Sequence, residues 1–411
     1  MDICSIRKDF PILNRTVNGK KLVYLDNAAT TQMPSQVLYA YTQHYSLDNA
    51  NVHRGIHTLS EISTAKLEDA RAAAARFIGA PSPECIVFTS GTTDSVNTVV
   101  RAWAENMARG SFSIVATAME HHSNYLPWLD LCTRRGGNFV EIPLSQDGRL
   151  DTVALGKALT PETILFAVTY VSNVTGAVND IKGLIDLAHS RGVPVLVDAA
   201  QAAREFPIDV SELGADFLCL SAHKMLGPSG VGLLYVAKRH FEELVPCRLG
   251  GGMISDIRNG LPVYEQMPHF LEAGTPNIGG IVAFHEAIRY IESVSRGYIE
   301  ERETMLTSRL REMLSQLKDV RILGLSDTGG SCVSVVSGRF HPYDAALLLD
   351  KQGVAVRSGT HCAIPCHRAL GVTGSLRFSP AFYNTEDELE AAVTAFDRAL
   401  SILDRAAGGK P

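Results

Sequence analysis

The chain has 411 residues, of which 45% are hydrophobic and 20% are charged, and its formal net charge is -6 at pH 7. This composition is typical of a folded protein of about two domains, and it excludes a binding peptide, a single small β-barrel and a disordered chain. The acidic balance argues against a nucleic-acid-binding protein, because such proteins usually present a basic surface.

The apolar runs are short. Val193–Leu196 is soon followed by Asp198, whereas a membrane span needs roughly 18 consecutive apolar residues. The first nine residues mix acids and bases without an apolar core, so we expect no secretion signal and a cytoplasmic location. The cysteines are scattered without a dense framework, which predicts reduced thiols.

Helix-like and strand-like segments alternate from about residue 60 to residue 236. The strands are expected at 85–89, 114–117, 163–169, 193–198 and 216–220. Helical spacing of apolar residues predicts helices over 96–107, closed by Gly110, and over 181–188, closed by Gly192. Strands separated by helices predict a mainly parallel sheet that is covered on both faces.

Beyond about residue 280 a helical stretch is followed by short strands near 333–336, 354–356 and 375–378 and by a final helix from Leu389 to Leu403. We therefore expect an α/β protein with three parts. An N-terminal segment (1–20) packs on the small domain, a large domain covers 21–280, and a smaller α+β domain covers 281–411. The glycine-rich stretch 249–276 is expected to be irregular and to join the domains or reach a partner subunit.

Lys224 stands between the apolar segment Asp216–Leu220 and a glycine turn at 227–230. At a sheet edge its amine can form a Schiff base with an aldehyde cofactor, although a lone lysine is also typical of a solvated surface. Asp198 ends a strand at the carboxyl edge, where ligands bind in open α/β sheets. An acid there can keep a pyridinium nitrogen protonated, as pyridoxal phosphate requires, or it can cap the next helix. Gln201 can donate to the phenolic oxygen of the same cofactor.

Ser90–Thr93 follows an expected strand and precedes a helix. Its glycine allows close approach of the backbone, and the free N–H groups and threonine hydroxyls can hold a phosphate. The same four residues also make a good helix cap.

His121 and His122 follow the strand at 114–117. Adjacent histidines can bind a metal, but no cysteine or acid pattern completes a zinc set, so no metal is expected. A flat imidazole that stacks on an aromatic cofactor and shuttles protons explains the placement better.

Cys362 lies beside His361, with Arg357 nearby. This cationic setting favours a reactive thiolate, and the alternative is an inert small-domain cysteine. A metal or redox pair with Cys366 is disfavoured, because three residues separate the two and no second pair is present.

Further motifs extend the pattern along the chain: Tyr24–Thr31, Asn51–His57, Gly274–Asn277, Leu376–Arg377 and Tyr383–Thr385. With these motifs the chain resembles, almost end to end, the class V, fold-type I pyridoxal-phosphate enzymes. Within them it resembles the Suf-type (group II) cysteine desulfurases and selenocysteine lyases.

This resemblance implies a cofactor site of pyridoxal 5'-phosphate. Lys224 would bind it covalently, His122 would stack on its pyridine ring, Asp198 would pair with the ring nitrogen and Gln201 would contact its hydroxyl oxygen. The residues implied at the phosphate are Thr92 and Thr93 in the Ser90–Thr93 turn, Ser221, His223, and Thr275 from the neighbouring subunit of a homodimer.

The resemblance also implies a substrate site. Asn173 and Arg377 would bind the substrate carboxylate, and Cys362 would accept the sulfur. His53 and Arg357 would take less defined substrate-binding roles near that cysteine.

The implied function is that of a cysteine desulfurase, which converts L-cysteine to L-alanine, leaves a persulfide on Cys362 and passes the sulfur to a Suf-type acceptor or scaffold protein for iron-sulfur clusters or other thio-cofactors. One alternative is a pyridoxal-phosphate lyase acting on selenocysteine, cysteine sulfinate or another C–S substrate. Others are a class V epimerase or aminotransferase and, least favoured, a non-enzymatic assembly subunit.

Several residues depart from the commonest pattern of this family. Tyr170 stands where a histidine is usual, and Ala199 follows the cofactor aspartate in place of glycine. A ring and a methyl group near the cofactor are expected to affect substrate preference. The run Phe378-Ser379-Pro380 after Arg377 and the additional Cys366 also depart, and a packing role is the favoured interpretation for Cys366.

Overall fold

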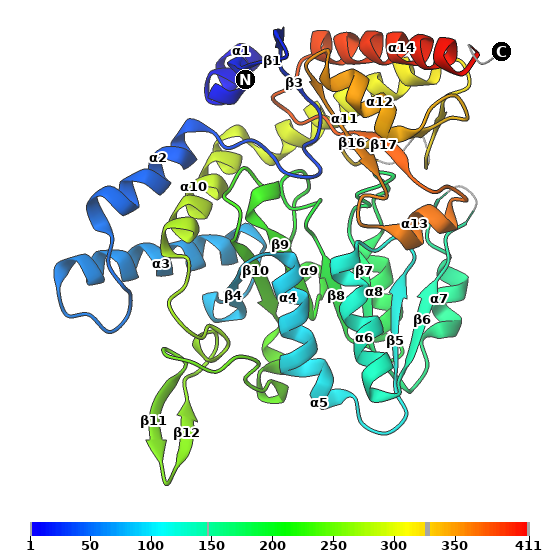
Figure 1. The fold of residues 1–411 in the computed structure, drawn as a ribbon. Helices are drawn as coiled ribbons and strands as arrows, with labels where there is room; N and C mark the ends of the chain where they lie inside the picture. Colours follow the sequence, from blue (N-terminus) through cyan, green and yellow to red (C-terminus); the bar gives the residue numbers. More distant parts are fainter. Residues whose placement is uncertain (1, 146–147, 325–328, 409–411) are drawn as a thin grey trace.

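The computed structural model describes residues 2–145, 148–324 and 329–408. Its largest sheet has seven strands in the order β4-β10-β9-β8-β7-β5-β6 (Figure 1). These strands are β4 (Ile86–Thr89), β5 (Ser113–Thr117), β6 (Asn138–Ile142), β7 (Thr163–Thr169), β8 (Val195–Asp198), β9 (Phe217–Ser221) and β10 (Gly232–Val236). Within this sheet only β10 runs against its neighbours, so the carboxyl ends of the other six strands lie at one edge.

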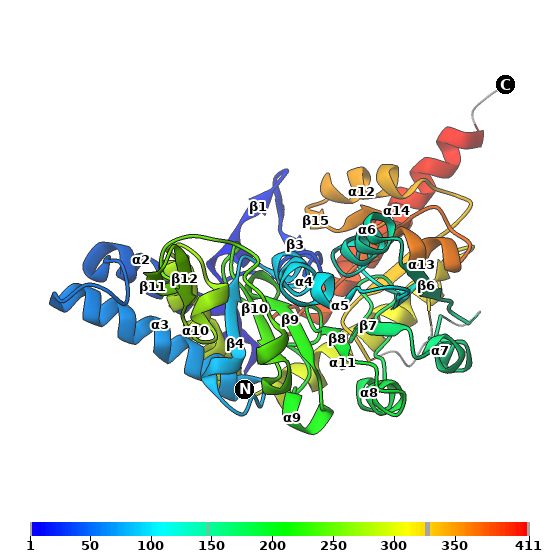
Figure 2. The ribbon, with the colours of Figure 1, turned by 90° about the horizontal axis from the view of Figure 1, so that it is seen from below.

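Helices cover both faces of this sheet (Figure 2). One face packs against α3 (Thr58–Phe77), α8 (Ile181–His189) and α10 (Ile278–Val294). The other packs against α4 (Thr92–Val99) and α6 (Leu126–Arg135). Successive strand residues point to opposite faces: Val195 and Val197 belong to the first core and Leu196 to the second. The mainly parallel, doubly covered sheet expected from the alternating pattern is confirmed.

The C-terminal part forms a second, antiparallel sheet in the order β13-β14-β17-β16. Its strands are β13 (Arg321–Ile322), β14 (Val333–Val336), β16 (Arg357–Gly359) and β17 (Ser375–Phe378), and its helices are α11 (Arg296–Ser315), α12 (Pro342–Asp350) and α14 (Glu386–Gly408). Leu310, Val333 and Phe396 are fully buried in its separate core. The smaller α+β domain lies above the large sheet in Figure 1.

The N-terminal segment (1–20) contacts both domains. Phe10 packs in the core of the large sheet, and Arg7 pairs with Glu388 of the small domain at 2.6 Å. Just after this segment, β3 (Val23–Tyr24) pairs in parallel with β15 (Val354–Ala355) of the small domain. Helix α10 is buried in the large core, so a boundary at residue 280 would divide it. The break between α10 and α11, at Ser295, fits these two cores better.

The stretch 249–276 is not irregular throughout, and that expectation is wrong. It contains a hairpin, β11 (Ile254–Arg258) and β12 (Leu261–Tyr264), which projects from the domain (Figure 1). The remaining elements are α1 (Ile3–Lys8), η1 (Pro11–Asn14), β1 (Thr16–Val17), β2 (Lys20–Lys21), α2 (Ser35–Gln43), η2 (His44–Asp48), η3 (Pro83–Cys85), η4 (Val100–Ala104), α5 (Glu105–Met107), η5 (His122–Asn124), α7 (Thr152–Ala158), α9 (Val210–Leu213), η6 (Ala222–Lys224), η7 (Lys238–Glu243), η8 (His269–Leu271) and α13 (Ile364–Ala369). No helix among the described residues has the length and hydrophobicity needed to cross a membrane.

Candidate active site

A cavity of about 260 Å³ opens at the carboxyl edge of the large sheet, close to the lower size limit of ligand pockets, about 300 Å³. Its lining includes many of the residues singled out in the sequence: Thr92, Thr93, Asn173, Asp198, Ser221, His223, Lys224, Arg357, Cys362 and Arg377. Large-domain and small-domain residues therefore face one another across it.

Chain topology explains this convergence. Asp198 is the last residue of β8, Ser221 is the last residue of β9, and Thr92 begins the helix after β4. Because these strands run in the same direction, their carboxyl ends and the loops that follow meet at one edge. Residues separated by more than a hundred positions thus become neighbours.

Asp198 is buried, Lys224 is partly buried, and the two side chains interact electrostatically. Burial raises the pKa of Asp198, and Lys224 opposes that shift. Burial lowers the pKa of Lys224, and Asp198 opposes that shift in turn. The backbone N–H of Ala200 donates to Asp198 Oδ1 at 2.9 Å and holds the carboxylate in the cavity wall. An amine whose pKa is lowered, in the same cavity as a held carboxylate, suits Schiff-base chemistry on a ring that needs a protonated nitrogen.

Hydroxyl groups and N–H groups gather at the start of α4. The N–H of Thr92 donates to Ser221 Oγ at 2.8 Å, and the Thr93 and Ser123 hydroxyls lie 2.6 Å apart. This turn packs closely on β10, because a Cβ at Gly232 would lie 2.4 Å from the Cα of Gly91. A helix N-terminus surrounded by hydroxyl groups is a suitable phosphate site.

His121, not His122, lines the cavity. Burial, reinforced by Lys224, lowers the pKa of His121 to about 3, so the ring is neutral. Its Nδ1 accepts the backbone N–H of Ser123 at 3.1 Å, which places the ring proton on Nε2. The ring that faces the cavity is thus that of His121, and the ring of His122, which was expected to stack on the cofactor, does not line it.

His122 holds the loop that carries Cys362. Its backbone N–H donates to the Cys362 carbonyl oxygen at 2.7 Å, and its Nε2 accepts the N–H of Ile364 at 3.2 Å. His361 and Cys362 both have positive φ values, 51° and 54°, which is unusual for residues with side chains. These contacts maintain the strained loop and present an exposed thiol to the cavity.

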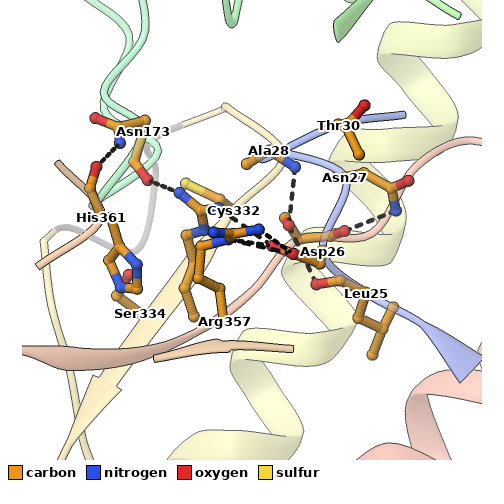
Figure 3. Close-up of polar contacts among 12 residues, drawn as sticks. Leu25, Asp26, Asn27, Ala28, Thr30, Asn173, Cys332, Ser334, Arg357 and His361 are labelled. Carbon is orange, nitrogen blue, oxygen red and sulfur yellow. Dashed lines mark hydrogen bonds and ion pairs between the residues drawn. The ribbon is translucent and has the colours of Figure 1, made fainter. Parts of the chain in front are cut away.

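Arg377 is buried and Arg357 is half-exposed, with side-chain exposures of 2% and 47%. Arg377 Nη1 donates to the carbonyl oxygen of Asn173 at 2.8 Å, and its Nε is buried without a hydrogen-bond partner among the described residues. The Asn173 side chain donates to the His361 carbonyl oxygen at 2.8 Å (Figure 3). Both arginines contact Asp26, which Figure 3 shows directed toward Arg357. The cavity is therefore bordered by a buried guanidinium, which favours an anionic group there.

Three other expected residues do not line this cavity in the single chain: Gln201, Thr275 and His53. Gln201 Nε2 donates to the carbonyl oxygen of Ala28, so it supports the wall from outside. Thr275 borders a separate surface cavity with Arg248.

His53 lies 3.9 Å from Glu68 and packs its ring against His269, with the ring centroids 5.0 Å apart. These three residues are also the one group in the described part of the chain that has ligand atoms close enough for a metal ion. The substrate-binding role expected of His53 gains no support from its position in the single chain.

The departures from the family pattern lie behind the wall. Tyr170 stacks on Phe206, and Ala199 is buried in the large core, so neither lines the cavity. Cys366 is fully buried among Val174 and Leu323, and burial raises its pKa to about 12. These positions fit packing roles.

The lining also includes residues that the sequence reasoning did not select: Ala28, Ala29, His121, Ser123, Ala200 and His361. Ala28 and Ala29 lie in the Tyr24–Thr31 motif, and the others adjoin selected residues. These positions therefore lie in or beside motifs recognised in the sequence, but the sequence did not show which side chains point into the cavity.

The donor set fits pyridoxal 5'-phosphate. One wall offers a buried carboxylate for a ring nitrogen, a lysine amine lies in the same cavity, and a helix N-terminus with hydroxyl groups can receive a phosphate.

Comparison with known proteins agrees. Residues 23–392 match the Aminotransferase class-V family. Cysteine desulfurases of Cronobacter sakazakii and Escherichia coli O127:H6 are each 41% identical over 399 residues, which is 97% of this chain and 98% of theirs. The crystal structure of the Escherichia coli cysteine desulfurase CsdA (S-sulfonic acid) superimposes with a TM-score of 0.91 at 35% identity, covering 98% of this chain and 99% of that one. The apo cysteine desulfurase of Thermococcus onnurineus NA1 also gives a TM-score of 0.91, at 36% identity, covering 100% and 99%. The chain therefore belongs to the class-V aminotransferase family and, within it, to the cysteine desulfurases.

Proposed function

We propose that this enzyme converts L-cysteine to L-alanine with pyridoxal 5'-phosphate bound at Lys224, and that Cys362 receives the sulfur as a persulfide. The observation that carries the proposal is that Lys224 and Cys362, from different domains, line one cavity and interact electrostatically. An epimerase or aminotransferase has no need of a thiol at that position.

When bound, the cofactor supplies an electron sink for the bonds at the substrate α-carbon. Asp198 would hold a proton on the ring nitrogen, and the neutral ring of His121 would stack on the ring face. Thr92, Thr93, Ser221 and His223 would bind the phosphate. Lys224 Nζ, once free, would move the α-proton, and its lowered pKa favours the neutral amine that this step needs.

Arg377 would bind the substrate carboxylate. Its charge is buried, its Nε lacks a hydrogen-bond partner among the described residues, and a carboxylate can meet a guanidinium in two parallel hydrogen bonds. Asn173 supports this arrangement, because its carbonyl oxygen accepts from Arg377 and its side chain holds the loop before Cys362.

Cys362 as thiolate would then attack the substrate sulfur. A new S–S bond forms, the C–S bond breaks, and the carbon fragment takes the bonding electrons and a proton to become alanine. The balance is L-cysteine plus the Cys362 thiol giving L-alanine plus the Cys362 persulfide. A thiol on an acceptor protein then takes the terminal sulfur and restores Cys362.

The finer expectations belong to the same proposal. Thr275, outside the cavity of its own chain, is available to the site of a second subunit in a homodimer. The exposed Cys362 is accessible to a Suf-type acceptor. All eight cysteines are free thiols, in keeping with a cytoplasmic enzyme.

The test is to incubate the purified holoenzyme with L-cysteine and to measure alanine and protein-bound persulfide by mass spectrometry. We expect equal amounts in a single turnover, with the persulfide on the peptide that contains Cys362. Cys362→Ala should lose cysteine turnover but retain turnover of L-cysteine sulfinate, which needs no thiol attack. The matched control, Cys366→Ala, should retain both. Alanine formed without bound sulfur, or full activity of Cys362→Ala, would refute the assignment.

A further inference from the structure

Two imidazole rings and one carboxylate come together outside the cavity that Lys224 lines. His53 lies in the loop before α3, Glu68 lies within α3, and His269 begins η8. One ligand atom of each lies within 4.8 Å of those of the other two, and no other such group occurs among the residues that the structure describes. None of the three lines the cavity. These residues form the His–Glu–His trio.

Helix α3 holds the first two members in register. The backbone N–H of His53 donates to Thr64 Oγ1 at 2.8 Å, and Glu68 follows Thr64 by one helical turn, so both lie on the same face of the helix. His53 has a φ of 69°, a left-handed conformation that is uncommon for a residue with a side chain. The hydrogen bond and the turned backbone bring its imidazole beside the carboxylate, with Nε2 3.9 Å from Glu68 Oε1.

The third member is anchored in the large domain. His269 precedes Phe270 and Leu271, which are buried in an apolar core of the large sheet, so its backbone is fixed although its side chain is 37% exposed. Its ring meets that of His53 edge to face, at an interplanar angle of 68°. Glu272 Oε2 lies 3.9 Å from His269 Nδ1, and a carboxylate behind a metal-binding histidine commonly orients its ring.

The charges around the trio favour a cation. Arg71 donates from Nε to Glu68 Oε2 at 3.0 Å and from Nη1 and Nη2 to the two carboxylate oxygens of Glu272 at 2.7 and 2.9 Å. Its contact with Glu68 Oε1 is longer, 3.3 Å, which leaves that oxygen able to bind an ion. Two carboxylates and one guanidinium leave one negative charge when the imidazoles are neutral, the form in which histidine binds metals. Arg54 is directed elsewhere, since its Nη2 donates to the carbonyl oxygen of Ile254 at 3.0 Å.

The ligand types select among metals. Two imidazoles and one carboxylate form a set that is typical of Zn²⁺ with an open fourth position, whereas Ca²⁺ and Mg²⁺ prefer oxygen ligands alone. Zinc bonds of about 2.0–2.1 Å in a tetrahedral arrangement require ligand atoms about 3.3 Å apart. The separation of 3.9 Å between His53 and Glu68 can shorten to that value by side-chain rotation, because each side chain is 38% exposed.

We propose that His53, Glu68 and His269 bind one Zn²⁺ ion per chain, with water as the fourth ligand. The ion joins the loop before α3 to the segment that leads from the hairpin β11–β12 to Thr275, and it fixes these distant parts of the chain against each other. No metal was expected from the sequence, because these three residues form no local motif. The inference does not depend on the proposed function.

The test is zinc binding by the untagged holoenzyme in a background without its two exposed thiols, Cys4→Ser with Cys362→Ala, because thiolates also bind zinc. Isothermal titration with ZnCl₂ should give one site per chain. His269→Ala and His53→Ala should each weaken binding at least about 100-fold, since the loss of an outer partner alone typically costs about 10- to 100-fold. X-ray absorption at the zinc edge should show nitrogen and oxygen neighbours at about 2.0–2.1 Å and no sulfur at about 2.3 Å.

The matched control is His285→Ala. His285 is a partly buried histidine of α10, as His269 is of η8, and it lies outside the trio. Its zinc affinity should equal that of the background protein. Equal weakening in His285→Ala, an affinity unchanged in both His53→Ala and His269→Ala, or sulfur around the zinc would overturn the inference.

Thermal unfolding supplies a second readout. An ion that binds only the folded state stabilises it, so ZnCl₂ should raise the Tm of the background protein and of His285→Ala but not that of His269→Ala. A Tm raised equally in all three would count against the site. If His269→Ala does not fold, the exposed His53 decides, and a zinc affinity unchanged in His53→Ala would refute the proposal.

Discussion

Beneath Lys224 lies a buried ion pair whose removal should have an unusual effect on stability. Arg204 Nη2 and Nε donate to the two carboxylate oxygens of Glu303 at 2.6 and 3.0 Å, and the side chains are 5% and 0% exposed. Arg204 Nη1 also donates to the carbonyl oxygen of Lys224 at 3.3 Å. Breaking one partner of such a pair usually costs about 3 to 5 kcal/mol, because the other charge stays buried and unpaired.

A second carboxyl group changes that expectation. Glu205 is fully buried, and its pKa is raised well above the usual range, first by burial and then by the negative charge of Glu303, with Arg204 opposing. We therefore expect Glu205 to be protonated in the native protein. When Glu303→Gln removes the neighbouring charge, Glu205 can ionise and pair with Arg204.

We therefore expect Glu303→Gln alone to cost about 2 kcal/mol of unfolding free energy at pH 7, and Glu303→Gln with Glu205→Gln to cost about 4 kcal/mol, the full value for an unpaired buried charge. Glu205→Gln alone should be neutral or stabilising. A carboxyl group whose pKa rises on folding stabilises the folded state below its unfolded pKa, about 4.3, and loses that contribution as the pH rises through its folded pKa. The advantage of Glu205→Gln over the wild type should therefore grow above about pH 4.3.

The assay is urea denaturation of the four proteins between pH 5 and pH 8, followed by tryptophan fluorescence. Asp186→Asn is the control, since its pair with Lys182 is exposed and its loss should cost at most about 0.5 kcal/mol. If Glu205→Gln destabilises the protein as much as Glu303→Gln, Glu205 is ionised in the native state and the reasoning is refuted. The reasoning would also be refuted if the unfolding free energy lost in the double variant equalled the sum of the losses in the two single variants.

The remaining predictions concern the cavity. His121→Ala should weaken cofactor binding about 10-fold, because a stacked ring is lost, whereas His122→Ala should leave binding within about twofold and instead speed alkylation of Cys362 through a looser loop. Fluorescence titration of the cofactor-free protein measures the cofactor affinity, and peptide mass spectrometry measures the alkylation. Equal cofactor affinities of the two variants would contradict the assignment. Arg377→Lys should raise KM for L-cysteine at least about 10-fold, because an ammonium cannot make two parallel hydrogen bonds to a carboxylate, and an unchanged KM in steady-state alanine formation would remove Arg377 from the substrate site. Cys366→Ala should cost about 1 kcal/mol in urea unfolding through the small cavity it leaves, and loss of persulfide on Cys362 in this variant would show that Cys366 has more than a packing role.

Much of the fold follows from local patterns. Strands β7 (163–169) and β14 (333–336) have the bounds expected from their apolar runs. Helix α8 (181–189) ends before Gly192, as the spacing of its apolar residues and the glycine predicted. The hairpin β11–β12 was missed because its strands are short and almost entirely exposed, so they lack the buried apolar run by which the other strands were recognised. The assignment of α10 to the large domain depends on which core buries its apolar face, and two apolar cores look alike in sequence.

The sequence by itself determined which chemical groups this protein possesses: a lysine, an aspartate and a phosphate-binding turn at strand ends, and a cysteine among basic residues. Only the tertiary structure decided which of two adjacent histidines faces the cavity, because η5 (His122–Asn124) turns the two rings into different surroundings. The same holds for the pairing of Asp26 with arginines 331 and 351 residues away. Side-chain direction and the distance between remote charges arise from packing, which no local pattern of residues specifies.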